Sequence, residues 1–286
     1  MVSEKKQILI LDSTGMAGHM ISRYLSSLGK YEIINLKWDD SSQDHISTAN
    51  IYDTVLFREL IIRKSPDIII NCVRLLVEES DHHPDKAIYF NSYLPHYLSK
   101  IAREIGAKVI QLSTDCVFSG EKGNYSEDDI RDGTNVYARS KALGELENNI
   151  DITIRTSFIG PNINQRSEEL FHWFLLQEGE INGYSRAFWT GITTLELAKS
   201  IDKLLDMDFS GLYHLVPDEK ISKYELLVLI KNIWKKDIII NEDDSVIADK
   251  SLADNNRIIR TEDYATMFKE LNQWMNENKD LYQIYF

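Results

Sequence analysis

The chain has 286 residues, 43% of them hydrophobic, and a formal net charge of −13. This length and composition allow a substantial buried core, in one large domain or in one domain with a smaller partner. The acidic balance and the scattered Lys and Arg residues argue against a nucleic-acid-binding surface, which needs clustered positive charge. Any anionic ligand must therefore find a local positive site.

Several classes of protein are disfavoured by what the sequence lacks. It has no apolar run of about 18 residues, and no basic start leads into an apolar stretch, so we expect no membrane span, no secretory signal and a cytoplasmic location. Cys72 and Cys116 show no CxxC spacing, and the adjacent His82 and His83 have no third ligand nearby. We therefore expect reduced thiols and no metal site.

The first half of the chain alternates between two kinds of pattern. Helical spacing occurs between short apolar, β-branched runs that are typical of parallel strands covered on both faces. This alternation predicts an α/β fold, a Rossmann-type doubly wound parallel sheet with ligands at the carboxyl ends of its strands. The predicted strands are residues 7–11, 32–36, 67–71, 107–113 and 151–157, and the helical stretches are 15–29, 84–106 and 135–149.

The regular alternation loosens after about residue 158. Helical spacing returns at 193–207 and 223–236, and 211–216 is strand-like. We predict a dinucleotide-binding domain over 1–157 and a smaller, mainly substrate-binding part over 158–286, with some segments of the latter returning to the first domain.

Tyr137 and Lys141 are four residues apart, so on a helix they share one face. An ammonium group beside a phenol favours the phenolate, which lets the phenol exchange a proton near neutral pH. The pattern alone is weak evidence in a chain with 14 tyrosines. Its context strengthens it, because Ser113 and Thr114 end the strand that precedes this helix.

Five segments now point to one family. In chain order, they read "TGMAGHM", "STDCVFSG", "YARSKALGE", "IRTSFIGP" and "GLYHL". As a set, the sequence resembles the extended short-chain dehydrogenase/reductases, and within them the dTDP-4-dehydrorhamnose reductase group. This resemblance implies a nucleotide-sugar substrate, NADPH or NADH as cofactor, and reduction of the 4-keto group of a nucleotide-linked 6-deoxy sugar for surface polysaccharide.

The resemblance also implies roles for individual residues on the catalytic side. Thr114 is expected to hold the sugar carbonyl, and Tyr137 to protonate its oxygen. Lys141 is expected to bind the nicotinamide ribose and to lower the pKa of Tyr137. Phe158 falls beside the sugar, although a place in the core suits it equally well, and Cys116 is expected on the substrate side.

Cys116 bears on the type of reaction. Related nucleotide-sugar 4,6-dehydratases read Thr-Asp-Glu where this chain has Thr114, Asp115 and Cys116. Without the second acid, elimination of water loses a proton-transfer partner, so reduction is favoured over dehydration. Epimerisation stays open because it uses the same tyrosine and a transient ketone.

On the cofactor side, Gly15, Met16 and Gly18 match the turn that lets the backbone approach a pyrophosphate. Asn71 matches a position near the cofactor ribose. Lys37 follows the second strand, where it could accept the 2′-phosphate of NADPH or simply be solvated, and Asp39 lies slightly beyond. NADPH is weakly favoured over NADH.

Two residues depart from the family pattern. Asp12 stands where the turn normally has its first glycine, and Arg74 stands where small residues pass the cofactor. Asp12 could repel a pyrophosphate or cap the following helix, as Ser13 or Thr14 equally could. Arg74 could fill cofactor space, neutralise Asp12 or grip a phosphate.

These departures keep a second functional class open. A non-catalytic regulatory or binding subunit with the same fold is the alternative to an enzyme, although the presence of Thr114, Tyr137 and Lys141 favours catalysis. The sequence leaves the oligomeric state undetermined, with a homodimer as one candidate.

Overall fold

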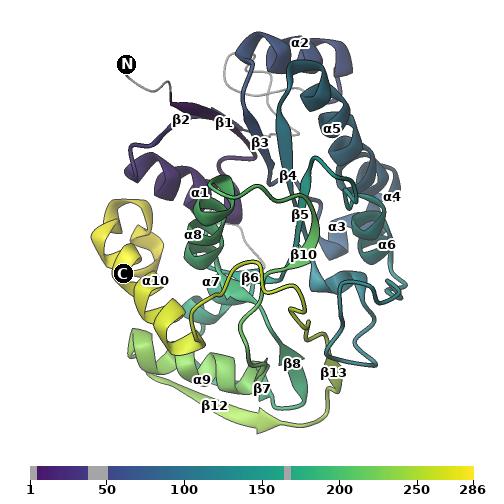
Figure 1. Ribbon diagram of the computed structural model, residues 1–286. Coiled ribbons are helices and arrows are strands. Elements are labelled where there is room, and N and C mark those ends of the chain that lie inside the picture. The colour runs from purple at the N-terminus through teal and green to yellow at the C-terminus, as the bar shows by residue number, and fades with distance from the viewer. Residues whose placement is uncertain (1–4, 38–50, 164–168) are drawn as a thin grey trace.

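The computed structural model describes residues 5–37, 51–163 and 169–286. Its centre is a six-stranded parallel sheet in the order β10-β5-β4-β3-β1-β2 (Figure 1). The predicted Rossmann-type α/β fold is confirmed. The strands are β1 (Lys6–Leu11), β2 (Tyr31–Leu36), β3 (Ile68–Asn71), β4 (Lys108–Ser113), β5 (Ile152–Arg155) and β10 (Gly211–His214).

Helices cover both faces of this sheet, as the apolar character of the strands requires. In β1, Ile8 and Ile10 belong to the core shared with α1 (Met16–Ser27) and α8 (Thr194–Leu205). Leu9 and Leu11 belong to the core on the opposite face, with α2 (Thr54–Lys64) and α5 (Leu94–Ile105). Alternate residues of one strand therefore hold two helical layers.

The helix predicted over 84–106 is interrupted. It consists of α4 (Pro84–Ala87), a π-helical segment η1 (Ile88–Tyr93) and α5, which has Pro95 in its first turn. A proline has no N–H for a regular helical hydrogen bond, which explains why the helical geometry changes here. The π segment places Asn91 so that its amide bonds both the N–H and the carbonyl of Leu75.

Helix α6 (Val136–Leu143), which carries Tyr137 and Lys141, is shorter than predicted. It is capped by the Asn135 side chain, which accepts a hydrogen bond from the N–H of Ala138, and it ends at Gly144. A Cβ at Gly144 would lie only 1.8 Å from the carbonyl oxygen of Asn91. Close packing of the helix end against the π segment therefore requires glycine there.

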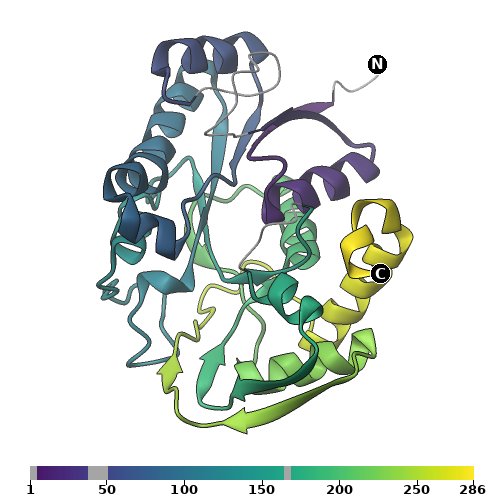
Figure 2. The ribbon, with the colours of Figure 1, turned by 180° about the vertical axis from the view of Figure 1, so that it is seen from behind.

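The C-terminal residues form a smaller lobe beside the main sheet (Figures 1 and 2). However, α8 packs on α1, and β10 pairs with β5, so these later segments lie in the main sheet layers. The division at 157/158 stays a prediction. The lobe contains β6 (Phe158–Ile159), α7 (Leu170–Leu176), β7 (Gly179–Tyr184), β8 (Ala187–Trp189), β9 (Ile192–Thr193), β11 (Ile221–Ser222), α9 (Lys223–Trp234), β12 (Ile238–Asp243), β13 (Ala248–Asp249) and α10 (Tyr264–Glu277).

Short helices complete the described fold, namely α3 (Val77–His82), η2 (Asp115–Val117), η3 (Lys279–Leu281) and η4 (Gln283–Tyr285). Among the residues described, no helix combines the length and the apolar character needed to cross a membrane. The same residues contain no group of three or more His, Cys, Asp or Glu side chains arranged to hold a metal ion.

Candidate active site

A small pocket lies at the carboxyl edge of the sheet, where β3, β4 and β5 end. Its volume is about 50 Å³, and it collects four residues predicted from the sequence: Thr114, Tyr137, Lys141 and Phe158. Segments far apart in the chain supply these side chains, because the ends of parallel strands meet at one edge. Arg74 lines the same pocket.

The hydroxyl of Thr114 is held in place by its own loop. It accepts a hydrogen bond from the Cys116 N–H at 3.1 Å and donates one to Oδ1 of Asp115, also at 3.1 Å. Thr114 thereby caps η2, so the local turn fixes the hydroxyl at the end of β4.

Tyr137 is buried, and burial raises its pKa to about 12, against the lowering effects of the Arg74 charge and of a hydrogen bond between Tyr137 and Thr114. The phenol is therefore protonated at neutral pH, as a proton donor must be.

Lys141 is also buried, and burial together with the nearby Arg74 charge lowers its pKa to about 8. Its ammonium donates a hydrogen bond to the carbonyl oxygen of Leu112 at 2.7 Å. The cation that lowers the pKa of Tyr137 in this structure is Arg74. The expected effect of Lys141 on the phenol stays a prediction.

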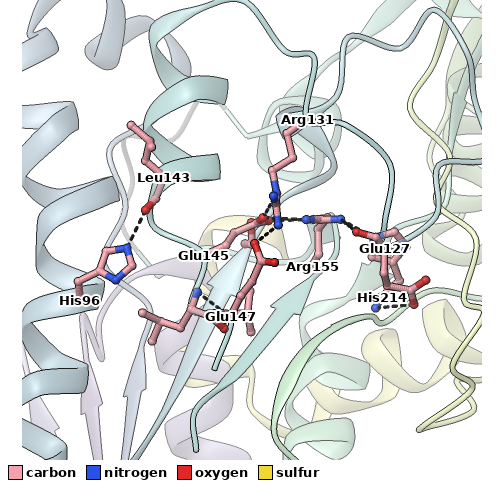
Figure 3. A network of polar contacts seen from close by, with 11 residues as sticks. His96, Glu127, Arg131, Leu143, Glu145, Glu147, Arg155 and His214 are labelled. Atoms are coloured by element: carbon pink, nitrogen blue, oxygen red, sulfur yellow. Dashed lines mark hydrogen bonds and ion pairs between the residues drawn. The ribbon is translucent and has the colours of Figure 1, made fainter. Parts of the chain in front are cut away.

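A buried ionic network supports the catalytic edge from behind (Figure 3). Glu145 accepts hydrogen bonds from Ser113 at 2.5 Å and from Arg155 at 2.7 and 2.8 Å, and it also pairs with Arg131. Both Glu145 and Arg155 have fully buried side chains. Because Ser113 precedes Thr114, this network ties the end of β4 to β5 and α6.

His214 extends the network to β10. Its Nδ1 lies 2.7 Å from the carbonyl oxygen of Ala253, and its Nε2 lies 2.9 Å from Nη1 of Arg155. Nδ1 must therefore donate, and Nε2 must accept from the arginine. Burial and the Arg155 charge lower the pKa of His214 to about 4, so the ring is neutral.

The turn after β1 has the close contacts that its glycines suggest. A Cβ at Gly18 would lie 2.0 Å from the carbonyl oxygen of Asp12, and one at Gly15 would lie 2.2 Å from Oδ2 of the same residue. Gly15 is the N-cap of α1, and Met16 is its first residue. The N-cap residue is therefore not Asp12, Ser13 or Thr14, although the carboxyl of Asp12 does accept a hydrogen bond from a backbone N–H at the start of the helix, that of Gly15.

Asp12 itself has a positive φ of 58°, a conformation that Asp tolerates better than most residues. Burial raises the pKa of its carboxyl to about 7, although the charge of Arg74 and the N–H of Gly15 lower it. Near pH 7, the carboxyl is therefore only partly ionised.

Arg74 bridges the two parts of the molecule across the pocket. It forms an ion pair with Glu169, and its guanidinium carbon lies 5.0 Å from the ring centroid of Phe158. Asn162 donates a hydrogen bond to the other oxygen of Glu169 at 3.2 Å. The sequence left open whether Arg74 fills cofactor space, neutralises Asp12 or grips a phosphate. Its contacts favour the second role, because its charge partly neutralises Asp12, and its side chain also occupies the catalytic pocket.

This arrangement fits a dinucleotide cofactor. Gly15 itself adds no side chain at the N-terminus of α1, where a phosphate would approach, and the side chain that reaches this point is the carboxyl of Asp12, which accepts a hydrogen bond from the N–H of Gly15. The repulsion expected from Asp12 is reduced by its high pKa and by the Arg74 charge.

The remaining predicted cofactor residues lie apart from the pocket lining or already have partners. The Asn71 amide is buried, donates to Oε1 of Gln111 at 2.7 Å and accepts from the N–H of Val73. Lys37 is exposed directly after β2, and Asp39 lies outside the described residues. Their proposed contacts with a cofactor stay predictions.

Both cysteines are free thiols. Burial raises the pKa of Cys116 to about 11, and burial also raises the pKa of Cys72. Cys72 lines the catalytic pocket, whereas Cys116 lies in η2 beside it and is absent from the lining. A substrate contact of Cys116 stays a prediction.

The sequence interpretation missed three residues of the site: Glu145, Arg155 and Glu169. Arg155 had a usable signal, because a charged residue inside the apolar run of β5 requires a buried partner. Glu145 lies four residues after Lys141 and could have been paired with it. No sequence signal points to Glu169.

A parallel Rossmann-type sheet with Thr114, Tyr137 and Lys141 at its carboxyl edge defines the short-chain dehydrogenase/reductase class. Within this class, the chain belongs to the RmlD substrate binding domain family, whose sequence profile matches residues 6–281.

Known proteins agree with this assignment. The chain is 29% identical over 231 residues to the spore coat polysaccharide biosynthesis protein SpsK of Bacillus subtilis, covering 78% of each chain. It is 24% identical over 245 residues to methionine adenosyltransferase 2 subunit beta of Bos taurus, covering 80% of this chain and 72% of that one. Its fold matches the crystal structure of dTDP-4-dehydrorhamnose reductase from Bacillus anthracis in complex with NADP, with a TM-score of 0.81, 19% identity and coverage of 96% and 100%.

Proposed function

We propose that this protein is an NAD(P)H-dependent reductase that acts on the 4-keto group of a nucleotide-linked 6-deoxy sugar in surface polysaccharide synthesis. The observation that carries the proposal is the meeting of Thr114, Tyr137 and Lys141 in one pocket of a chain of the RmlD substrate binding domain family. The name of SpsK supports the polysaccharide context.

The chain's own groups suit the proton-transfer half of such a reaction. Tyr137, protonated at neutral pH, donates its proton to the carbonyl oxygen of the sugar, and the Thr114 hydroxyl, rotated from Asp115 towards the substrate, donates a hydrogen bond to the same oxygen. Lys141 adds a positive charge in a buried pocket, where it stabilises negative charge that develops on that oxygen. When bound, the reduced nicotinamide supplies a hydride to the carbonyl carbon.

Other residues would hold the two ligands. The backbone around Gly15, Met16 and Gly18 would hold the pyrophosphate at the start of α1, and Asn71 would lie near the ribose. Lys37 would hold the 2′-phosphate of NADPH.

Phe158 and Cys116 lie on the substrate side of this arrangement. Cys116 cannot replace the acid that a dehydratase uses at this position, because its pKa is raised to about 11. This supports reduction over dehydration, and an epimerase remains the second enzymatic candidate.

We also propose that the protein works in the cytoplasm as a homodimer. A cytoplasmic place suits the free thiols and the supply of NAD(P)H. The dimer proposal is supported by large apolar side chains that are exposed on α2 and η1: Val55, Leu56, Ile88 and Tyr93. Light scattering of the purified protein tests it, and a monomer at micromolar concentration would contradict it.

A non-catalytic subunit is the candidate from another class. It is favoured by Asp12 in the cofactor turn, by Arg74 in the catalytic pocket and by the similarity to methionine adenosyltransferase 2 subunit beta. The intact Thr114, Tyr137 and Lys141 cluster favours the enzyme, since a binding subunit has no need of a buried proton donor.

Titration of the purified protein with NADPH and NADH, followed by assay with a dTDP-4-keto-6-deoxy sugar, separates these candidates. The proposal expects binding of at least one cofactor and loss of its absorbance at 340 nm on addition of the sugar nucleotide. Binding without turnover for dTDP- and UDP-linked 4-keto sugars would favour the non-catalytic subunit. Absence of any cofactor binding would contradict the reductase outright.

A further inference from the structure

The short helices η3 and η4, which follow α10, reach back to the turn after β1. This part of the chain lies beside α1 in both ribbon views (Figures 1 and 2). The hydroxyl of Tyr282, between η3 and η4, lies 3.1 Å from Nε2 of His19 on α1, and the two rings meet edge to face with centroids 5.8 Å apart. Folding thus joins two residues that are 263 positions apart.

His19 connects Tyr282 to the start of α1. Its Nδ1 lies 3.0 Å from the carbonyl oxygen of Gly15, the N-cap residue. A carbonyl oxygen can only accept, so Nδ1 carries the proton, and Nε2 accepts from the Tyr282 hydroxyl. Burial lowers the pKa of His19 to about 4, so at neutral pH the ring is neutral and carries the single proton that this arrangement requires.

Both side chains of this contact are buried. Tyr282 is fully buried, and His19 is 3% exposed. Burial raises the pKa of Tyr282 to about 12, so its hydroxyl keeps its proton at neutral pH and can donate it in the hydrogen bond. Water cannot easily replace a partner at such a depth, so removal of the hydroxyl would leave Nε2 of His19 unsatisfied.

A second tyrosine anchors the same segment. The hydroxyl of Tyr285 accepts a hydrogen bond from the N–H of Asn162 at 3.0 Å and lies 2.8 Å from Nδ1 of His172 on α7. The N–H of Tyr285 also donates to the carbonyl oxygen of Tyr282 at 2.9 Å, which closes the turn between the two tyrosines. The segment is therefore attached at two points, and this limits the motion of the Tyr282 hydroxyl.

These contacts fix a peptide group at the N-terminus of α1. The carbonyl of Gly15 and the N–H of Met16 belong to one planar peptide group, so hydrogen bonds that hold the carbonyl also set the direction of the N–H. Met16 is the first residue of α1, and the first N–H groups of a helix have no partner within the helix. Such N–H groups are available to bind a phosphate.

Both peptide groups of Gly15 are held. Its N–H donates to the carbonyl oxygen of Asp12 at 3.1 Å, within the turn itself. Its carbonyl accepts from the ring and from the backbone N–H of His19, each at 3.0 Å. The ring of His19 is the member of this set whose position depends on a residue outside the turn and the helix, namely Tyr282.

We propose that Tyr282 is a positioning residue for the cofactor: through His19, it fixes the Gly15–Met16 peptide group in the direction that a bound pyrophosphate requires. The inference rests on the proposed function, because it concerns the cofactor site of the same reductase. It adds a residue of the C-terminal lobe whose hydroxyl acts through another side chain and does not itself touch the cofactor.

Calorimetric titration with NADPH of the wild type and of Tyr282→Phe, which keeps the ring and removes only the hydroxyl, tests the inference. We expect Tyr282→Phe to weaken NADPH binding by about fivefold, in line with the loss of one hydrogen bond. In steady-state kinetics with a dTDP-4-keto-6-deoxy sugar, the KM for NADPH should rise to a similar extent. The kcat should stay within about twofold, because the proton donor is unchanged.

Variants of His19 test the same path at its middle. His19→Phe keeps a ring but has no donor for the Gly15 carbonyl, so it should weaken NADPH binding by about fivefold or more. His19→Asn has a side-chain amide that can donate to this carbonyl without Tyr282. It should therefore bind NADPH within about twofold of the wild type, and combining it with Tyr282→Phe should cause no further loss.

Tyr264→Phe is the matched control. Tyr264 lies on α10, and its hydroxyl donates to the carbonyl oxygen of Trp189 in the C-terminal lobe at 3.2 Å. This variant also removes one tyrosine hydrogen bond, so it should lower stability in urea about as much as Tyr282→Phe does, but change NADPH affinity less than about twofold. The order parameter of the Met16 amide, measured by NMR without cofactor, should fall in Tyr282→Phe and stay unchanged in Tyr264→Phe.

Two results overturn the inference: equal NADPH affinity in Tyr282→Phe and Tyr264→Phe, or an order parameter of the Met16 amide that Tyr282→Phe leaves unchanged. The assay with the sugar nucleotide separates these results from the reductase proposal. NADPH affinity that depends on Tyr282, without turnover, would support the inference and contradict the reductase. Turnover with NADPH affinity that is independent of Tyr282 would do the reverse, and absence of NADPH binding by the wild type would contradict both.

Discussion

Two regions at the same edge of the sheet differ in how they handle charge. Behind Thr114 and Tyr137, the buried carboxylate of Glu145 is paired with Arg155 and Arg131. In the turn after β1, Asp12 is partly buried and has no ion-pair partner among the described residues, because Arg74 pairs with Glu169 instead. The Glu145 carboxyl therefore stays ionised near neutral pH, because its pKa is lowered. The second region contains a carboxyl that titrates near neutral pH.

The two sides of the site therefore differ in how far they depart from the family pattern. The catalytic hydroxyls keep the pattern of the family, while the turn has an aspartate at the position of its first glycine. The affinity for the cofactor should therefore depend on pH around neutrality, because the carboxyl of Asp12 titrates there.

The largest expected effect comes from breaking the paired region. Glu145→Gln should lower the free energy of unfolding by about 3–5 kcal/mol, because it leaves Arg155 buried without a full countercharge. The pKa of Glu145 is held below its usual 4.5 by Arg155, against the effect of burial. The ionic contribution is therefore complete above about pH 4.5 and lost as the pH falls through the lower folded-state pKa.

Urea denaturation at pH 7 and pH 4 measures this effect. Glu147→Gln is the control, since Glu147 pairs with the same Arg131 but has a side chain that is 56% exposed. It should change stability by less than about 1 kcal/mol. Equal losses in the two variants would show that the buried network does not stabilise the catalytic edge.

Removal of the proton donor tests the same region by activity. Tyr137→Phe should lower turnover by about 100-fold or more, the usual range for general acid catalysis, with cofactor affinity nearly unchanged. Steady-state kinetics and cofactor titration measure the two quantities. Tyr93→Phe, at an exposed position, is the control. Unchanged turnover in Tyr137→Phe would show that Tyr137 is not the proton donor.

The turn is tested by cofactor affinity as a function of pH. If a bound pyrophosphate requires protonated Asp12, affinity should fall about 10-fold from pH 6 to pH 8, because the pKa of Asp12 is about 7. Asp12→Gly should abolish this fall and bind NADPH about 10-fold more tightly than the wild type at pH 8.

Variants of Arg74 extend this measurement of cofactor affinity against pH. Arg74→Gly alone should move the midpoint of this fall to higher pH, because the charge of Arg74 lowers the pKa of Asp12, and the Asp12→Gly, Arg74→Gly double variant should show no fall. Calorimetric titration of all four proteins is the measurement. Micromolar binding by the wild type that no variant improves would show that Asp12 is tolerated in the turn. Binding seen only in the double variant would instead favour the non-catalytic subunit.

The smallest expected effect concerns the choice of cofactor. Lys37→Asp should weaken NADPH binding about fivefold more than NADH binding, because it replaces a charge-assisted contact with repulsion. Lys100→Asp, at an exposed position on α5, is the control for net charge. Equal losses for both cofactors would show that Lys37 does not read the 2′-phosphate.

The strands of the main sheet could be predicted closely because their signal is local. Continuous β-branched runs located β1 to β4 with errors of one residue at their starts. The helices were less accurate at their ends. The stretch predicted over 84–106 changes geometry around Pro95, and α6 ends at Gly144 because of a contact with Asn91, which is distant in the chain.

The sequence by itself determined the fold class, the family and the gathering of Thr114, Tyr137 and Lys141, because strand order and helix spacing bring these positions to one edge. Tertiary structure alone decided the electrostatics. The Arg74–Glu169 pair joins residues 95 positions apart, and Lys223 meets Trp189 across the C-terminal lobe. The pKa of a side chain depends on its burial and on the charges that folding brings near it, and the local sequence specifies neither of these.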